Sequence, residues 1–240
     1  MEKSLANKVI IVTGGEGLLG REMVKDITEK GGVAISADIS EETNLALHKL
    51  NLDVTSESSI IEALKLVNQK FGKIDGFVNN AYPRTKDWGN KFEDIEFESW
   101  QKNVDLQMNS VFLCIQKVMP YLLKSKGNVV NIGSVYGVVG NDFTVYENTG
   151  LTSPAAYSAI KGGLTNFTRY LASYYGKEGD RVNIVSPGGI FDNQHEKFVK
   201  QYEHKDSKKR MGTPEDMASS GHFLVYDGGE YITDTNIIFD

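Results

Sequence analysis

Tyr157 and Lys161 are the residues of this chain whose types and spacing best suit chemistry. They lie four residues apart, and on a helix this spacing places both side chains on one face. An ammonium beside a phenol favours the phenolate and lowers the phenol pKa from about 10. Such a tyrosine exchanges protons with an alcohol or a carbonyl near neutral pH. Because most pairs of this kind are ordinary helix surface, the prediction depends on what the rest of the chain places beside them.

A glycine-rich turn near the N-terminus indicates a phosphate site. The run Thr13-Gly14-Gly15-Glu16-Gly17-Leu18-Leu19-Gly20 follows a short apolar segment and opens a helical pattern. Glycines let the backbone approach a pyrophosphate, and the helix N-terminus supplies N–H donors. Asp38 ends the next apolar segment, where a carboxylate accepts both adenosine-ribose hydroxyls and repels a 2′-phosphate. These features predict a site that prefers NAD(H) to NADP(H), although Asp38 also suits a plain surface turn.

Strand-like and helical segments alternate along the chain, which predicts an α/β fold with a parallel sheet and helices on both faces. A helix is expected behind Ser153, as its N-cap, with Pro154 at the first helical position. Another helix is expected to begin at a cap on Ser56 or Ser58 and to end at Gly72. The expected strands are 9–12, 33–37, 50–53, 74–78, 128–132, 182–185 and 236–239, and the other helices are 18–30, 56–71 and 97–124, with a kink or break at Pro120.

Composition describes an ordinary globular chain of 240 residues, 40% hydrophobic and 24% charged. A net charge of −6 disfavours a nucleic-acid partner. The N-terminus has no apolar signal core, and no apolar stretch is long enough for a membrane span, so we expect a cytoplasmic protein. The histidines lack partners at metal-ligand spacing, so no metal site is expected.

The chain resembles the short-chain dehydrogenase/reductase family over essentially its whole length. The resemblance implies one Rossmann-type domain over residues 1–240, with a doubly wound seven-stranded sheet in the order 3-2-1-4-5-6-7. Each motif is short, but their joint order and spacing are specific. The motifs stand in the family's order: the glycine-rich turn, Asp38, Asp53-Val54, Asn79-Asn80-Ala81, Ser134, Tyr157 with Lys161, and Ser186-Pro187-Gly188.

The resemblance also implies what these residues do. Tyr157 would exchange a proton with the substrate as hydride moves to or from the nicotinamide, Lys161 would hold the nicotinamide ribose, and Ser134 would bind the carbonyl oxygen. The implied cofactor-binding residues are Gly14, Glu16, Leu18, Leu19, Asp38, Asp53, Val54, Asn80, Ala81, Tyr157, Lys161, Pro187, Gly188 and Ile190.

Several positions depart from the family pattern. The glycine spacing, with Leu18 at the usual middle glycine, is typical of longer nucleotide-sugar epimerases and dehydratases. Tyr82 follows Asn-Asn-Ala where glycine is usual. The asparagine that supports a water beside the catalytic lysine falls at Gln107, whose amide still donates and accepts. Asn109 is the alternative for this role.

Two segments are expected to shape the substrate site. Residues 140–152 are expected to be an insertion relative to the family, beside the mouth of the site, with a plain surface loop as the alternative. Residues 189–212 suit a mobile, highly charged lid. Arg84 and Tyr146 are the predicted substrate contacts, because an arginine fork binds phosphate or carboxylate. A solvated helix is the alternative for the charged lid.

The predicted function is NAD-dependent transfer of hydride between nicotinamide and a secondary alcohol or ketone, on a sugar-derived or phosphorylated small molecule. A weaker resemblance to dehydrogenases associated with bacterial flagellar or surface-glycan (nonulosonic acid) biosynthesis favours the same substrates. The alternatives are a non-catalytic dinucleotide sensor and a sugar epimerase or dehydratase that retains NAD. The resemblance also implies a homodimer or homotetramer through the helices near 97–124 and 153–176.

Overall fold

A parallel sheet of seven strands forms the centre of the molecule in a computed structural model that describes residues 4–218, 229 and 231–240. The strand order is β3-β2-β1-β4-β5-β6-β7, so the order implied by the family resemblance is confirmed. The strands are β1 (Val9–Thr13), β2 (Val33–Asp38), β3 (Lys49–Asn51), β4 (Gly76–Asn79), β5 (Asn128–Ile132), β6 (Arg181–Pro187) and β7 (Asn236–Phe239).

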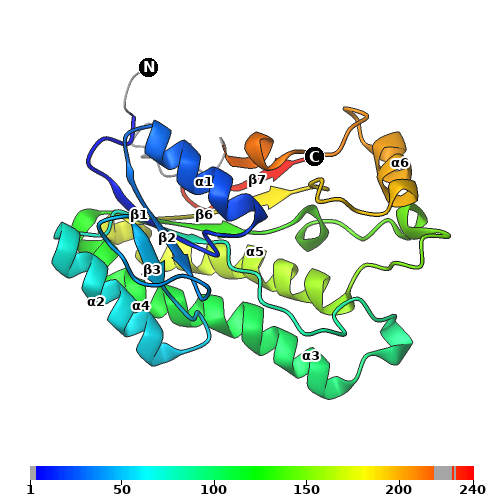
Figure 1. The fold of residues 1–240 in the computed structure, drawn as a ribbon, viewed down its shortest axis with the longest axis horizontal. Helices are drawn as coiled ribbons and strands as arrows, with labels where there is room; N and C mark the ends of the chain where they lie inside the picture. The colour runs from blue at the N-terminus through cyan, green and yellow to red at the C-terminus, as the bar shows by residue number, and fades with distance from the viewer. Residues whose placement is uncertain (1–3, 219–228, 230) are drawn as a thin grey trace.

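Helices cover both faces of the sheet (Figure 1). On one face lie α2, α4 and α5, and on the other lies α1 beside a helical turn at 214–218. Each face has its own apolar core, one containing Ile60, Ile115 and Leu164, the other Met23 and Met217. The helices are α1 (Leu18–Glu29), α2 (Glu57–Phe71), α3 (Phe97–Val104), α4 (Ser110–Ser125), α5 (Ala155–Tyr175) and α6 (Glu196–Lys205).

The order of strands reverses at β1, which pairs with β2 on one side and β4 on the other. In open parallel sheets, ligands bind outside the carboxyl ends of the strands at such a reversal. The residues at these strand ends include Thr13, Asp38 and Asn79. The fold therefore gathers the predicted motifs at one edge of the sheet.

Two local predictions need correction: the break, one of the two outcomes expected at Pro120, and the N-cap at Ser153. The helical segment does not break at Pro120, which lies inside α4. Pro120 and Gln116 are exposed, so water can bind the carbonyl that proline leaves without a donor. The departure from α geometry falls earlier, in a π-helical turn at Asp105–Asn109 that joins α3 to α4.

Ser153 is not the N-cap of α5. Pro154 takes that position with extended backbone and without a side-chain cap. Ser153 is buried and its hydroxyl accepts a hydrogen bond from Asn141, which lies in the 140–152 segment. Of the two serines expected at the N-cap of α2, Ser56 takes the position and accepts from the Ser59 N–H, and Gly72 ends the helix in the left-handed conformation as predicted.

Candidate active site

The glycine-rich turn leaves no room for side chains at Gly14 and Gly20, among other positions. Gly14 has φ 63°, and a Cβ there would lie 2.9 Å from the Ala81 Cα. A Cβ on Gly20 would lie 2.0 Å from the Gly14 carbonyl oxygen. A larger residue at Gly14 would collide with the backbone that follows β4, and one at Gly20 would push the start of α1 away from the turn.

Thr13 and Asn80 brace this turn. The Thr13 hydroxyl accepts from the N–H groups of Asn80 and Ala81 and donates to the Val78 carbonyl. The Asn80 amide donates to the carbonyls of Thr13 and Gly14 at 2.9 and 3.1 Å. From the sequence, Thr13 is identified only as part of the glycine-rich turn, and its bracing role is missed. The signal that could reveal this role is a buried threonine at the end of a central strand.

A crevice of about 590 Å³ runs along this edge of the sheet. Its walls bring together most of the predicted cofactor residues, from segments far apart in the chain. It is lined by Gly14, Leu18, Leu19, Asp38, Asn80, Tyr157, Lys161, Pro187, Gly188 and Ile190, among others. An adjoining hollow is lined by Asp53, Val54 and Ala81 together with Gly14 and Asp38.

Glu16 lies at the margin of this arrangement. Its carboxylate accepts from the Ser36 hydroxyl at 2.8 Å and lies 3.5 Å from Arg21 Nε. Its backbone N–H donates to Asp38. Its side chain is therefore engaged with β2 and α1.

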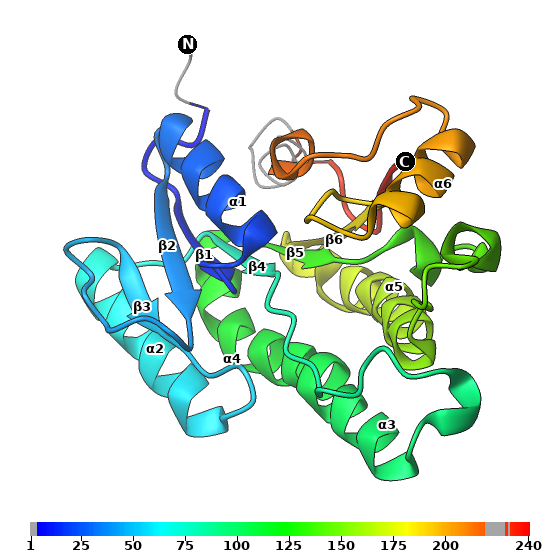
Figure 2. The ribbon, with the colours of Figure 1, turned by 45° about the vertical axis from the view of Figure 1, so that its right-hand side comes forward.

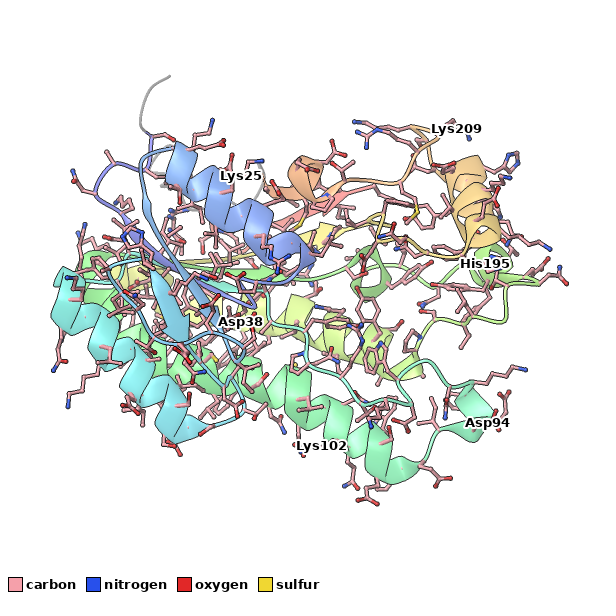
Figure 3. The ribbon with its side chains drawn as sticks, in the orientation of Figure 1. Lys25, Asp38, Asp94, Lys102, His195 and Lys209 are labelled. Carbon is pink, nitrogen blue, oxygen red and sulfur yellow. The ribbon has the colours of Figure 1, made fainter. Side chains whose placement is uncertain are left out.

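Asp38 is held at the end of β2, near the middle of the molecule (Figure 3). One carboxylate oxygen accepts from the N–H and hydroxyl of Ser40 at 3.0 and 2.8 Å. The other accepts from the Glu16 N–H at 3.3 Å. These contacts fix a negative charge at the junction of the crevice and the adjoining hollow.

Tyr157 and Lys161 both face the crevice from α5, but their electrostatics differ from the prediction. Lys161 Nζ lies 5.7 Å from the Tyr157 ring centroid and donates to the Ile132 carbonyl at 2.7 Å. Burial raises the pKa of Tyr157, and a hydrogen bond with Ser134 opposes that rise. Burial also lowers the pKa of Lys161 to about 8. The expected lowering of the phenol pKa is therefore wrong, because desolvation of the Tyr157 side chain dominates.

Tyr82, at the family's usual glycine position, occupies the centre of the site. It lines the crevice and the adjoining hollow. Its ring lies 5.6 Å from Lys161 Nζ, 5.0 Å from the Arg84 guanidinium carbon and 5.9 Å from the Tyr157 ring. Arg84 lines the crevice on this side. The sequence marks Tyr82 as a departure but does not identify it as a site residue.

Gln107 lies in the π-helical turn and is buried. Both polar atoms of its amide lack a hydrogen-bond partner among the described residues. Asn109 is exposed, and its amide donates to Asp105. The structure thus turns Gln107, not Asn109, toward the interior, and π turns recur at functional sites.

A second, smaller pocket of about 220 Å³ adjoins the crevice, and we name it the aromatic pocket. It takes in Tyr146 from the 140–152 segment and Phe198 and Tyr202 from α6. Tyr82, Tyr157 and Gly188 line both spaces. The aromatic pocket is lined by Tyr82, Ser134, Val135, Tyr136, Tyr146, Ser153, Pro154, Tyr157, Gly188, Gly189, Phe198 and Tyr202.

The 140–152 segment and α6 lie side by side (Figure 2), and both contribute residues to the wall of this pocket. Gln201 donates to the Val145 carbonyl at 2.8 Å, and Lys205 lies 3.0 Å from the Asp142 carboxylate. Val145 and Phe198 are buried in one small apolar cluster. The two segments that the sequence singled out therefore form one wall.

Within the described residues, no group of three His, Cys, Asp or Glu side chains is placed to hold a metal ion. Nor does any helix in that part of the chain have the length and apolar character needed to cross a membrane.

Comparisons with known proteins agree with this geometry. A family model described as enoyl-(acyl carrier protein) reductase matches residues 19–240. The chain is 34% identical to post-translational flagellin modification protein A of Campylobacter coli, over 98% of both chains. It is 27% identical to meso-2,3-butanediol dehydrogenase of Serratia marcescens, over 98% of this chain and 93% of the other.

A solved structure extends the agreement to three dimensions. It is a short chain dehydrogenase from Leptospira borgpetersenii with bound NAD+, at a TM-score of 0.88 and 30% identity, covering 98% of this chain and 92% of that one. With matches over nearly the whole chain and the same sheet order, the chain belongs to the short-chain dehydrogenase/reductase family, whose members are oxidoreductases acting on alcohol and ketone groups.

Proposed function

We propose that the protein transfers hydride between NAD(H) and a secondary alcohol or ketone on a polar small molecule, either sugar-derived or phosphorylated. One observation carries the proposal: Tyr157 lines both the crevice and the aromatic pocket. This position supports a phenol that serves both a dinucleotide in the crevice and a substrate in the aromatic pocket. Bound nicotinamide supplies or accepts the hydride, and the chain supplies the proton and the alignment.

Tyr157 takes the proton from a substrate hydroxyl during oxidation and returns it during reduction. Ser134 hydrogen-bonds Tyr157 and is placed to hold the reacting oxygen beside it. Lys161 holds the nicotinamide ribose. Its ammonium group is oriented by the hydrogen bond that it donates to the Ile132 carbonyl. Gln107 binds a water that links Lys161 to solvent; the support for this role is its buried amide without a partner among the described residues.

The rest of the crevice binds the dinucleotide. The turn at Gly14 and the N-terminus of α1, with Leu18 and Leu19, suit the pyrophosphate. Asp53, Val54 and Ala81 suit the adenine, Asn80 holds the turn, and Pro187, Gly188 and Ile190 flank the nicotinamide. Glu16 contributes through its backbone N–H to Asp38.

NAD(H) is favoured over NADP(H) because the Asp38 carboxylate faces the ribose position and repels a 2′-phosphate. The Leptospira relative, whose structure holds NAD+, supports the same cofactor. For the substrate, Tyr146 lines the aromatic pocket, and Arg84 stands on the crevice side of Tyr82. The similarity to a flagellin modification protein agrees with the flagellar resemblance noted in the sequence.

A Tyr157→Phe variant tests the catalytic assignment. The phenyl ring still fills the site, so NADH binding is expected within about threefold of wild type, while turnover falls by at least about 10³-fold. Binding is measured by NADH fluorescence and turnover by NADH absorbance with a panel of polyols, sugars and ketones. Turnover by the variant close to that of wild type would remove Tyr157 from the reaction.

A further inference from the structure

The aromatic pocket is small and walled by rings. Its volume, about 220 Å³, is below the roughly 300–1,000 Å³ of sites for drug-sized ligands. Tyr136, Tyr146, Phe198 and Tyr202 form much of its wall. The space matches one ring-sized group, and a larger substrate would have to extend beyond it.

Hydrogen bonds and packing hold these rings in place. The Tyr202 hydroxyl accepts from the Gly189 N–H and lies 3.2 Å from an Asp240 carboxylate oxygen, to which it donates. The Tyr146 hydroxyl interacts with those of Tyr136 and Ser153. The Tyr146 and Phe198 ring centroids are 5.1 Å apart. The wall is therefore ordered before a ligand arrives, which lowers the entropic cost of binding.

The pocket carries no charge on its wall. Among the residues described, none of those lining it is Asp, Glu, Lys, Arg or His. Burial raises the pKa of Tyr136, Tyr146 and Tyr202, which keeps the phenols neutral. An anionic group placed here would lose its hydration without a cationic partner, which costs far more than burying a hydroxyl.

The cations of α6, Lys209 and Arg84 do not line the pocket. On α6, Lys200 pairs with Glu196, and Lys205 pairs with Asp142. Lys209 lies at the outer edge of the molecule (Figure 3). The Arg84 guanidinium stands over the Tyr82 ring on the crevice side. The charges of residues 189–212 thus lie outside the aromatic pocket, whose lining residues are neutral.

Resting on the function proposed above, we infer that the aromatic pocket binds the reacting part of the substrate as a single uncharged, hydroxylated ring: a neutral monosaccharide or cyclic polyol. The aromatic faces receive the C–H faces of such a ring, and the neutral phenols and serines hydrogen-bond its hydroxyls. This selects neutral sugars over substrates with charge on the ring. It also makes Tyr146 a residue that determines specificity.

Matched sugars test the inference. Wild-type protein with NADH is titrated with glucose, galactose, mannose and myo-inositol, with the C6 uronates of the three hexoses, and with linear 2,3-butanediol, and binding is followed by saturation-transfer NMR. At least one neutral ring is expected to bind at least about tenfold more tightly than its uronate and than the diol. Equal or tighter binding of uronates, preference for the diol, or no binding of any neutral ring would overturn the inference.

Variants of Tyr146 test its part. Tyr146→Leu is expected to weaken binding of the preferred ring about tenfold, while Tyr146→Phe keeps the aromatic face and stays within about threefold. Tyr231→Leu, at a fully exposed tyrosine, is the matched control and is expected to change nothing. Equal losses in Tyr146→Leu and Tyr146→Phe would overturn stacking as the basis of recognition. NADH affinity, measured separately, distinguishes the two proposals: its absence in wild type would defeat the proposed function, whereas intact NADH binding without ring binding defeats only this inference.

Discussion

Burial disfavours the protonated, charged form of the Lys161 side chain. Its pKa falls from 10.5 to about 8 because the side chain is buried. Below about pH 8, folded and unfolded chains both bind the proton, and the folded state bears the full cost of burying it. Between about pH 8 and 10.5 the unfolded chain keeps a proton that the folded chain loses, so the free energy of unfolding rises with pH.

Replacing Lys161 by methionine removes this cost. We expect Lys161→Met to raise the free energy of unfolding by about 1–3 kcal/mol at pH 6.5, and by clearly less at pH 9.5. Urea unfolding of the cofactor-free protein measures both values. Lys65→Met, at an exposed lysine of α2, is the control. A less stable Lys161→Met at pH 6.5 would show that the Ile132 carbonyl and the Tyr82 ring outweigh desolvation.

Asp38 is expected to set the choice between NAD and NADP. Asp38→Ala removes the acceptor for the ribose hydroxyls and the charge that opposes a 2′-phosphate. The kcat/KM for NAD should fall about 10- to 100-fold, corresponding to loss of hydrogen bonds to a charged group, and the ratio of NADP to NAD activity should rise. Asp38→Asn, which keeps an acceptor, should retain more NAD activity. A wild-type enzyme that uses NADP as well as NAD would contradict this role.

Among the elements, the π turn at Asp105–Asn109 places a residue proposed to act in catalysis, Gln107, inside an otherwise structural helical segment. It turns the Gln107 amide inward, where an unpaired amide costs about 1–3 kcal/mol unless water binds it. Gln107→Leu is therefore expected to leave the free energy of unfolding unchanged or higher, while kcat falls about tenfold. Asn109→Leu, two positions on and exposed, should change kcat less than twofold. Unchanged kcat in Gln107→Leu would mean that the water relay is absent.

The elements themselves were largely predictable, because buried runs such as Val9–Thr13 lie between clear turn signals. The motif order predicted which strand ends would meet. The π turn was not predictable, since an extra residue in a helical turn depends on packing against α5. The break expected at Pro120, the N-cap expected at Ser153 and the lowered phenol pKa expected beside Lys161 are incorrect for the same reason. Each is decided by a tertiary contact or by burial.

At the scale of the molecule, one side of α4 and α5 exposes a row of aromatic rings. Phe112 of α4 lies 6.2 Å from Phe167 of α5, and Phe167, Tyr170 and Tyr174 follow at 6.3 and 5.9 Å. Phe112, Tyr170 and Tyr174 are 49%, 59% and 58% exposed. Contiguous exposed aromatics of this kind mark protein interfaces. They lie on the helical segments through which the family resemblance implies a dimer or tetramer.

We therefore expect the protein to associate with copies of itself through this row. A double variant, Phe112→Glu with Tyr170→Glu, places charge in an interface that must otherwise lose its water, and a twofold axis would repeat the cost on both subunits. Its dimer dissociation constant should rise at least about 100-fold, measured by sedimentation velocity across a concentration series. Tyr231→Glu, at a fully exposed position, should leave assembly unchanged. A wild-type protein that is monomeric at all concentrations would show that there is no such contact. A double variant that assembles like wild type would place the contact elsewhere.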